Sequence, residues 1–518
     1  MKDISSTGSF IDFTLENYIY VDKTEYIPKL VKLKRVFISR PRRFGKSLTL
    51  DTIATLFETG VEPYFKGTWI YDKWTEPTYP VFRLSFLNLD NSSMDLFKKQ
   101  LNSKITEFAN KIRVKGYVEK TEPEDSILSL LEKLEEETRQ IVILIDEYDY
   151  QLTSNINNDE LYKQFQQKIK RIYANIKDKF AIKFLGITGV TRLKDVAIFS
   201  VGSDIRDITN SSAYSQMIGF TRDEIKKFYI DYLKLAASYE NNCSVDDVTD
   251  TQLESLLDRL AKNYDGYCFD EFYKKKVFST WSVNSFFQSI VENKFVFFDE
   301  YWYDNGGLPS ILVNYLKTHE LNIFEYLDKD KFLKVSSDDF KNPTALTTIN
   351  QNVLMCQTGY LTLRSDLKKS STVLLGIPNG EIYKALNRLL ANNIFKGKAD
   401  VTDDQGKNLL EEGTVDDIIN LFNSALNSVS YDNYPIVSES SVQNMLKLYL
   451  LGAHQEVLSE VHEAKGRADL IVNTDIRRIV FEFKYAQNES EAKTKLSEAV
   501  EQIKSRDYGN ILPKSMSY

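Results

Sequence analysis

Residues 35–47 read Arg-Val-Phe-Ile-Ser-Arg-Pro-Arg-Arg-Phe-Gly-Lys-Ser, and a helical pattern beginning Leu-Thr-Leu-Asp follows at once. The first five residues predict a buried strand, because apolar β-forming side chains dominate them. A strand, a short loop ending in Gly-Lys-Ser and a helix are typical of a phosphate-binding loop. This stretch therefore predicts an α/β fold in which the loop follows a strand of a parallel sheet.

The residue types of the loop suit the binding of nucleotide phosphates. Backbone N–H groups of the loop and of the helix N-terminus would bind phosphate oxygens. Lys46 would place its charge on the β- and γ-phosphates, and Ser47 would offer its hydroxyl to Mg²⁺. We predict ATP and Mg²⁺ as cofactors, with the nucleotide held by Arg43, Phe44, Gly45, Lys46, Ser47 and Leu48.

The first position of the loop departs from the general motif. Six residues before Lys46 the general motif has glycine, whereas this chain has Arg40. On the motif alone, a basic loop at a helix start that binds no nucleotide remains open as the alternative.

Two later strands end in polar residues that would complete the site. The apolar run 141–145 leads into Asp146 and Glu147. Asp146 would hold Mg²⁺, and Glu147 would orient or deprotonate the attacking water, although a surface acid is the alternative for Glu147. Thr188 could sense the γ-phosphate, and Arg192 could stabilise transition-state charge within one chain or between chains. A capping threonine and a solvated arginine are the alternative for that pair.

The composition indicates a globular protein of about three domains, at roughly 100–200 residues per domain. The chain has 518 residues, 42% of them hydrophobic, and a formal net charge of −8. This balance argues mildly against a large surface that coats DNA without specificity. Three cysteines and three histidines without metal spacing argue against zinc. Neither a signal core nor a membrane-spanning run is present, so we expect a cytoplasmic protein without a membrane partner.

A second group of charged residues lies near the C-terminus. Strand alternation places Glu482 and Lys484 on one face, and Asp469 precedes them on a neighbouring strand. Asp469 and Glu482 would hold Mg²⁺ through carboxylate oxygens, and Lys484 would orient or polarise the attacking water. Glu460, nine residues before Asp469, could complete the set. The alternative is a Glu–Lys pair on an exposed face.

The N-terminal motifs resemble the AAA-ATPase-like family. Its members carry Tyr20-Val-Asp-Lys-Thr24 upstream of the loop Arg40–Ser47, and an arginine at the first loop position is a family trait. The resemblance also implies three motifs further along the chain, which are Tyr264-Asp-Gly-Tyr267, Gln357-Thr-Gly-Tyr-Leu361 and Ile377-Pro-Asn379.

The C-terminal motifs resemble the PD-(D/E)XK nuclease superfamily. They are Gly466-Arg-Ala-Asp469, Glu482-Phe-Lys484 and Gln502-Ile-Lys504. The resemblance implies a metal-dependent phosphodiester-cleaving site and a C-terminal α/β domain of restriction-endonuclease type. It therefore implies nucleic acid, with DNA favoured, as the partner.

Together these features predict three parts. They are a P-loop NTPase domain at 1–215, a helical lid or connecting domain at 216–370 and a nuclease-like domain at 371–518. The leading hypothesis is an ATP-binding, ATP-hydrolysing protein coupled to a Mg²⁺-dependent nuclease. A nucleotide-dependent switch or scaffold with an inactive nuclease-like domain, and an ATPase that remodels without cutting, are the alternatives. Assembly of like chains is left open.

Overall fold

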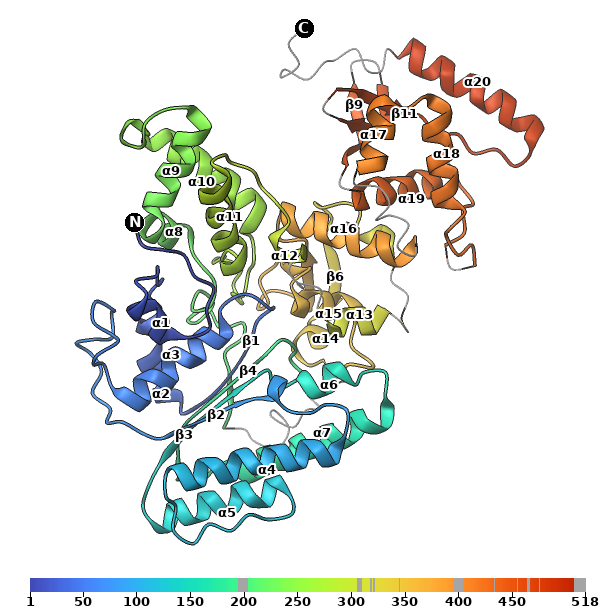
Figure 1. Cartoon of the computed structure of the whole chain (residues 1–518). Helices are drawn as coiled ribbons and strands as arrows, with labels where there is room; N and C mark the ends of the chain where they lie inside the picture. The colour runs from blue at the N-terminus through green and yellow to red at the C-terminus, as the bar shows by residue number, and fades with distance from the viewer. Residues whose placement is uncertain are drawn as a thin grey trace. The chain divides into compact units, whose positions relative to one another are not determined.

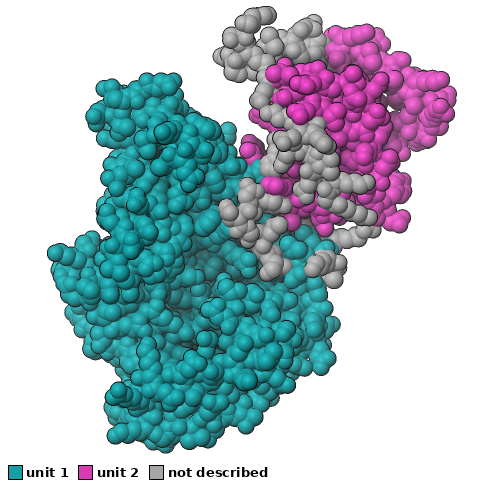
Figure 2. Space-filling view, viewed as in Figure 1, with its two compact units in different colours: residues 1–321, 332–381 teal, residues 322–331, 382–518 magenta. Residues whose placement is uncertain are grey.

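The computed structural model divides the chain into two compact units. Unit 1 comprises Met1–Leu321 and Phe332–Glu381, and unit 2 comprises Asn322–Lys331 and Ile382–Tyr518 (Figure 2). The residues described are 1–193, 204–304, 310–316, 319, 322–343, 345–395, 404–432, 434–453, 455–463, 466–474 and 476–506. The division into three parts at 215 and 370 stays a prediction.

A five-stranded parallel sheet forms the centre of the N-terminal half of unit 1. Its order is β2-β3-β4-β1-β5, and every neighbouring pair is parallel. The strands are β1 (Arg35–Ser39), β2 (Val81–Ser85), β3 (Ile141–Asp146), β4 (Ile182–Gly189) and β5 (Arg206–Asp207). Residues 141–145 are all buried, as expected for a strand covered on both faces. The predicted α/β fold with a parallel sheet is confirmed.

Helices cover this sheet on both faces (Figure 1). On one side lie α1 (Phe10–Leu15), α2 (Ile27–Leu33) and α3 (Lys46–Thr59). On the other lie α4 (Met94–Lys111), α5 (Pro123–Glu136) and α7 (Asp159–Ile176), which pack against one another. The short helix α6 (Tyr150–Ser154) follows β3. Because the strands are parallel, the polar residues at the carboxyl ends of β1, β3 and β4 lie at one edge of the sheet.

The rest of unit 1 is mainly helical. The helices α8 (Arg222–Phe228), α9 (Ile230–Asn241), α10 (Asp250–Tyr264) and α11 (Thr280–Asn293) share one apolar core. Capping boxes at Thr221 and Thr249 start α8 and α10, because each threonine oxygen accepts an otherwise unpaired helix N–H. Beyond them lie α12 (Tyr301–Asp304), α13 (Ser310–Leu316), α14 (Ser337–Lys341) and α15 (Gln351–Thr358).

A small antiparallel sheet also belongs to unit 1. Its order is β6-β8-β7, with β6 at Leu333–Ser336, β7 at Thr362–Leu363 and β8 at Thr372–Gly376. The helix α16 (Gly380–Ile394) begins directly after it.

Unit 2 combines helices with a second antiparallel sheet. The helix α16 belongs to this unit from Ile382 onward. The further helices are α17 (Asp404–Glu412), α18 (Val415–Leu426), α19 (Glu439–Gly452) and α20 (Glu489–Ser505). The sheet has the order β11-β10-β9, with β9 at Glu456–Glu463, β10 at Gly466–Asn473 and β11 at Arg478–Phe481. A C-terminal α/β part is thereby confirmed. Across the described residues, no helix combines the length and apolarity that a membrane span needs.

Candidate nucleotide and metal sites

The loop after β1 folds around the ammonium group of Lys46. Lys46 is buried, and its Nζ donates hydrogen bonds to the carbonyl oxygens of Arg40, at 3.0 Å, and Pro41, at 2.9 Å. Burial lowers the pKa of Lys46, and the nearby charge of Asp146 opposes this effect. The two loop carbonyls thus satisfy a cation that would otherwise be costly to bury.

The backbone of the loop needs left-handed conformations at two positions. Gly45, the N-cap of α3, has φ of 97°, and Arg43 has φ of 68°. Glycine adopts this region without strain, which explains its presence at the helix start. The first turn of α3, which begins at Lys46, leaves N–H groups without intrahelical partners beside the lysine. Such a helix start suits an anion.

Asp146 joins the polar ends of β1, β3 and β4. Its Oδ2 accepts a hydrogen bond of 2.6 Å from Ser47 Oγ, and its Oδ1 accepts one from Thr188 Oγ1. The N–H of Glu147 also donates to Oδ1, at 2.9 Å. The structure therefore brings together Ser47, Asp146 and Thr188, which the sequence predicted to act at one site.

Glu147 lies next to this group in an unusual backbone conformation. Its φ of 51° is in the left-handed region, which is costly for a residue with a side chain. Burial raises the pKa of Glu147, and the charge of Asp146 raises it further. A strained acid with a raised pKa beside Lys46 has the properties of a general base.

Arg192 is bound to an acidic residue of the sheet. Its Nε makes an ion pair with Asp207 of β5. Its backbone N–H donates to Gln357 Oε1 at 3.2 Å, and Gln357 Nε2 donates to the carbonyl of Arg192 at 3.3 Å. The guanidinium would therefore have to leave Asp207 before it could stabilise charge on a phosphate.

Arg40 is an anchor of the loop. It is 1% exposed, and its Nη1 donates to the carbonyls of Ser39, at 2.9 Å, and Thr209, at 2.7 Å. Its guanidinium lies 4.0 Å from the ring centre of Phe269. Burial lowers its pKa to about 9. The arginine at the glycine position of the general motif thus holds the loop to the turn that follows β5.

An aromatic cluster that sequence reasoning missed holds the loop from the other side. Phe44 is buried against Tyr267, Phe269 and Trp302, with ring centres 4.7, 5.5 and 6.0 Å away. Tyr267 belongs to one motif implied by the family resemblance, which is the signal that could have found the cluster. Phe44 therefore ties the loop to the helical part of unit 1.

Gly359 completes this contact between loop and helical part. A Cβ at Gly359 would lie 2.8 Å from the Cβ of Pro41, so only glycine lets the two segments approach this closely. Arg43 Nη1 donates to the carbonyl of Tyr301 at 3.0 Å, and its guanidinium lies 4.5 Å from the ring centre of Trp281. The side chain of Arg43 is therefore held by the helical part.

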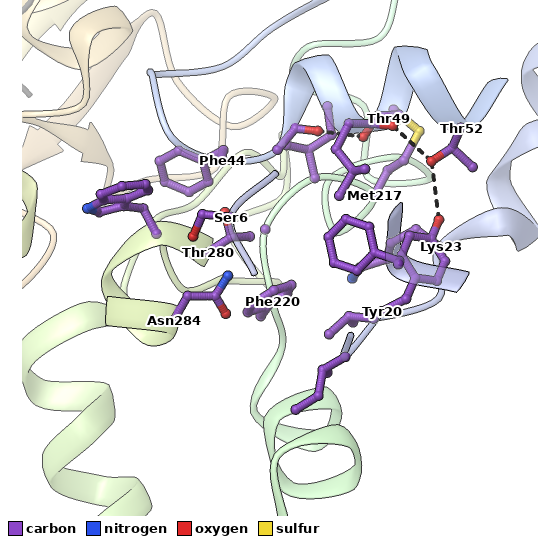
Figure 3. Close-up of a pocket in the computed structure, with 18 of the residues that line it drawn as sticks. Ser6, Tyr20, Lys23, Phe44, Thr49, Thr52, Met217, Phe220, Thr280 and Asn284 are labelled. Atoms are coloured by element: carbon purple, nitrogen blue, oxygen red, sulfur yellow. Dashed lines mark hydrogen bonds between the residues drawn. The ribbon is translucent and has the colours of Figure 1, made fainter. Parts of the chain in front are cut away.

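A cavity of about 160 Å³ opens beside the loop (Figure 3). Residues 43–45 and the helix α3, through Thr49 and Thr52, line one side. Tyr20 and Lys23 of the upstream motif and residues 217–220 line the other. The hydroxyl oxygens of Tyr20 and Thr52 are 3.5 Å apart, and Lys23 pairs with Glu224 at 2.6 Å. This mostly apolar cavity was also missed from the sequence.

In unit 2, the structure brings Asp469, Glu482 and Lys484 together. Leu470 of β10 pairs with Phe481 of β11, so the adjacent Asp469 and Glu482 lie side by side. Lys484 Nζ donates to Glu482 Oε1 at 2.7 Å, and Asp469 Oδ2 accepts from the N–H of Phe483 at 2.9 Å.

The carboxylate of Glu482 is buried and only partly hydrogen-bonded. Its side chain is 1% exposed, and its Oε2 is buried without a hydrogen-bond partner in the described part of the chain. Burial raises its pKa, and the charge of Asp469 contributes. A buried carboxylate oxygen without a donor suits a cation, so these residues fit Mg²⁺.

A third carboxylate, from a residue that sequence reasoning did not select, lies beside Lys484. Glu439, in the first turn of α19, has its Oε1 3.6 Å from Lys484 Nζ. Glu460 lies in β9, but its side chain is outside the described residues. Where side chains are described, no three His, Cys, Asp or Glu residues are grouped closely enough to hold a metal. No spacing in the sequence links Glu439 to Glu482.

Comparisons with known proteins divide the chain in the same way as its motifs. Residues 5–199 match the family model described as a predicted AAA-ATPase. Residues 437–514 match the model of the PD-(D/E)XK nuclease superfamily. The two matches stand in the order that the sequence motifs predicted, and both resemblances are confirmed.

A curated relative and a solved structure are also similar to the chain. The relative, "Uncharacterized protein in vnfD 5'region" of Azotobacter chroococcum mcd 1, is 26% identical over 518 residues, covering 96% of this chain and 90% of that protein. The solved structure, Cdc6p from Pyrobaculum aerophilum, is 12% identical and covers 72% of this chain and 96% of its own. The TM-score between the two structures is 0.25.

Proposed function

Because a predicted AAA-ATPase domain precedes a PD-(D/E)XK nuclease superfamily domain in this chain, we propose an ATP-controlled nuclease. It binds and hydrolyses ATP at the loop Arg40–Ser47 and cleaves phosphodiester bonds of nucleic acid, with DNA favoured, at Asp469, Glu482 and Lys484. Both sites use Mg²⁺.

The arrangement around Asp146 carries the nucleotide part of the proposal. Ser47 Oγ and Thr188 Oγ1 converge on its two carboxylate oxygens, at the sheet edge where Lys46 and the start of α3 lie. A cation, a hydroxyl, a carboxylate and helix N–H groups in one place match what a Mg²⁺-nucleotide needs.

Each residue of the loop has a task in this proposal. Lys46 exchanges its carbonyl partners, Arg40 and Pro41, for phosphate oxygens. Glu147 accepts the proton of the attacking water. Thr188 donates a hydrogen bond to the γ-phosphate. Arg192 stabilises the charge on the same phosphate once its guanidinium leaves Asp207. The cavity between α3 and Tyr20 takes the nucleoside, since an apolar cavity beside the loop suits a flat base.

The nuclease part uses the buried carboxylate of Glu482. Asp469 and Glu482 would hold Mg²⁺, and Glu439 supplies a further carboxylate beside Lys484. Glu460, whose side chain is outside the described residues, stays a candidate from the sequence alone. When bound, Mg²⁺ neutralises phosphate charge and makes a bound water more acidic. Lys484, held by Glu482 at 2.7 Å, orients the attacking water.

Cleavage assays with matched variants test this function. Linear and circular DNA and RNA are incubated with Mg²⁺ or Mn²⁺, with and without ATP. We expect cleavage by the wild type and its loss in Glu482→Ala. Glu501→Ala, which removes an exposed glutamate of α20, is the control and should cleave normally. Cleavage that survives in Glu482→Ala would exclude the proposed nuclease site.

The nucleotide site is tested separately by calorimetric titration with ATP. Lys46→Ala should lose ATP binding by at least about 100-fold, because the phosphates lose their main cation. Unchanged affinity would show that ATP does not bind at this loop.

A nucleotide-dependent switch or scaffold is the second candidate. The observation that favours it is the pair between Lys484 and Glu482, at 2.7 Å, because such a pair can be purely structural. ATP binding without cleavage of any substrate under any of these conditions would select this candidate.

A further inference from the structure

A second large cavity, of about 820 Å³, lies at the opposite edge of the parallel sheet from Lys46. It is lined by residues 34–35 at the start of β1, 73–76 before β2, Gln140 before β3 and 178–180 before β4. Because the strands are parallel, their amino ends meet at this edge and their carboxyl ends meet at the nucleotide loop. The cavity is therefore separate from the proposed nucleotide site.

The lining of this cavity is basic, although the whole chain has a net charge of −8. It contains six basic residues, Lys32, Lys34, Arg35, Lys73, Lys179 and Lys183, and two acidic ones, Glu76 and Asp178. We call this lined cavity the basic groove.

Half of these cations are neutralised by ion pairs. Lys183 pairs with Glu76 at 2.7 Å, Arg35 with Asp204 at 3.0 Å and Lys179 with Glu132 at 4.0 Å. These pairs hold the edge of the groove in place and add no net charge.

The other three cations are available to a ligand. Lys32 and Lys34 are exposed and make no ion pair with any described residue. Lys73 is also exposed. Its Nζ donates to the carbonyl of Trp69 at 3.0 Å and lies 4.5 Å from the centre of the Trp69 ring, and it makes no ion pair with a described acidic residue. Three ammonium groups without acidic partners around one cavity favour a ligand with several negative charges.

An exposed aromatic ring lies beside these lysines. Phe180 lines the groove and is 62% exposed, an unusual position for a large apolar side chain. Gln140 Nε2 donates to its carbonyl at 2.8 Å, which fixes the backbone that carries the ring. A flat exposed ring offers a stacking surface to an unpaired base.

We propose that the basic groove binds single-stranded nucleic acid, with backbone phosphates on Lys32, Lys34 and Lys73 and a base stacked on Phe180. Lysines along the backbone path and aromatic rings under the bases are the two requirements of sequence-tolerant single-strand binding. A duplex keeps its bases stacked inside and offers none to Phe180. The proposal shares only its partner, nucleic acid, with the proposed function, and needs neither ATP nor cleavage.

Binding of the full chain to labelled oligothymidylate and oligouridylate tests the groove. Fluorescence anisotropy is measured in EDTA without ATP, at several salt concentrations, so that neither proposed active site contributes chemistry. We expect wild-type binding to weaken with salt, because lysine–phosphate contacts release counterions. Binding of either strand supports the proposal, and binding of neither overturns it.

Two variants separate charge from stacking. Lys32→Glu with Lys34→Glu should weaken binding by about tenfold or more and reduce its salt dependence. Phe180→Ala should weaken binding by roughly fivefold to 100-fold and leave the salt dependence unchanged. All three side chains are exposed, so the fold should tolerate these changes.

The matched control is Lys99→Glu with Lys163→Glu, the same charge change on exposed lysines of α4 and α7 outside the groove. Its affinity should stay within about twofold of wild type at moderate salt. Equal losses in the control and the groove variant would assign binding to net charge and overturn the proposal. A blunt duplex that binds as tightly as the single strand would overturn it as well.

Discussion

Arg40 and Lys46 are two buried cations of one loop with different tasks. Arg40 donates into the protein, to the carbonyls of Ser39 and Thr209. Lys46 is held by carbonyls of the loop itself, from which phosphate oxygens can take it over. The arginine at the glycine position of the general motif thus stabilises the loop without competing for the ligand.

Replacement of Arg40 tests its anchoring role. Arg40→Gly restores the general motif but leaves two buried carbonyls without a charged donor, at a cost of about 1.5–3 kcal/mol. We expect a lower thermal midpoint by calorimetry. Arg42→Gly, which adds glycine flexibility two residues away, is the control and should change it much less. Equal midpoints for the two variants would contradict the anchoring role.

Glu381 provides a pH-dependent prediction. It is 2% exposed, it accepts hydrogen bonds from Ser282 Oγ and the N–H of Trp302, and burial raises its pKa to about 8. The native state therefore binds its proton more tightly than the unfolded state. The resulting stability is present below the unfolded pKa and is lost as the pH rises through about 8.

The variant Glu381→Gln keeps the shape of the side chain and removes its titration. Between pH 6 and about 9, the thermal midpoint should fall more in the wild type than in the variant. Scanning calorimetry across this range measures the difference. Parallel pH curves for the two proteins would contradict the raised pKa.

At the scale of elements, the nucleotide loop depends on close contacts between segments far apart in sequence. Gly266 follows α10 with φ of 98°, and a Cβ there would lie 2.2 Å from the carbonyl oxygen of Pro378. Asn379 Nδ2 donates to the carbonyl of Asp265 at 2.7 Å across the same contact. Two motifs implied by the family resemblance therefore meet here, and next to them Tyr267 packs on Phe44.

Substitution of Gly266 tests this contact. Gly266→Ala should lower the free energy of unfolding by about 1–3 kcal/mol, through the clash and the left-handed backbone together. Gly8→Ala is the control, since a Cβ at Gly8 meets nothing within 4 Å. Thermal unfolding of both variants gives the comparison. A Gly266→Ala midpoint equal to that of Gly8→Ala would show that the segment at Pro378 moves aside at little cost in free energy.

At the scale of the whole molecule, the two compact units carry the two proposed activities. The loop, its aromatic cluster and the basic groove lie in unit 1, and the carboxylate cluster lies in unit 2. Units with separate cores can unfold in separate transitions. Ligands should then stabilise one transition at a time.

Ligand binding gives a prediction at this scale. MgATP at about 100 times its Kd should stabilise unit 1 by about 2.7 kcal/mol. Scanning calorimetry should show one shifted transition, which Lys46→Ala abolishes and Glu482→Ala retains. A shift that survives in Lys46→Ala would place nucleotide binding elsewhere.

The sequence by itself determined the parallel sheet, the position of the loop and the meeting of Ser47, Asp146 and Thr188. Short apolar runs specify strands locally, and parallel strands bring their carboxyl ends to one edge whatever lies between them. The motif order also identified both families before any comparison. The roles of the site residues stay predictions.

Only the tertiary structure decided which partner each charged group has. It buried Arg40, paired Arg192 with Asp207, placed Glu439 beside Lys484 and gathered lysines from three segments into one groove. These contacts join residues that no short spacing links. They depend on how whole elements pack, because the burial and the charge partners of a residue are set by its neighbours in three dimensions. These neighbours cannot be predicted from the local sequence.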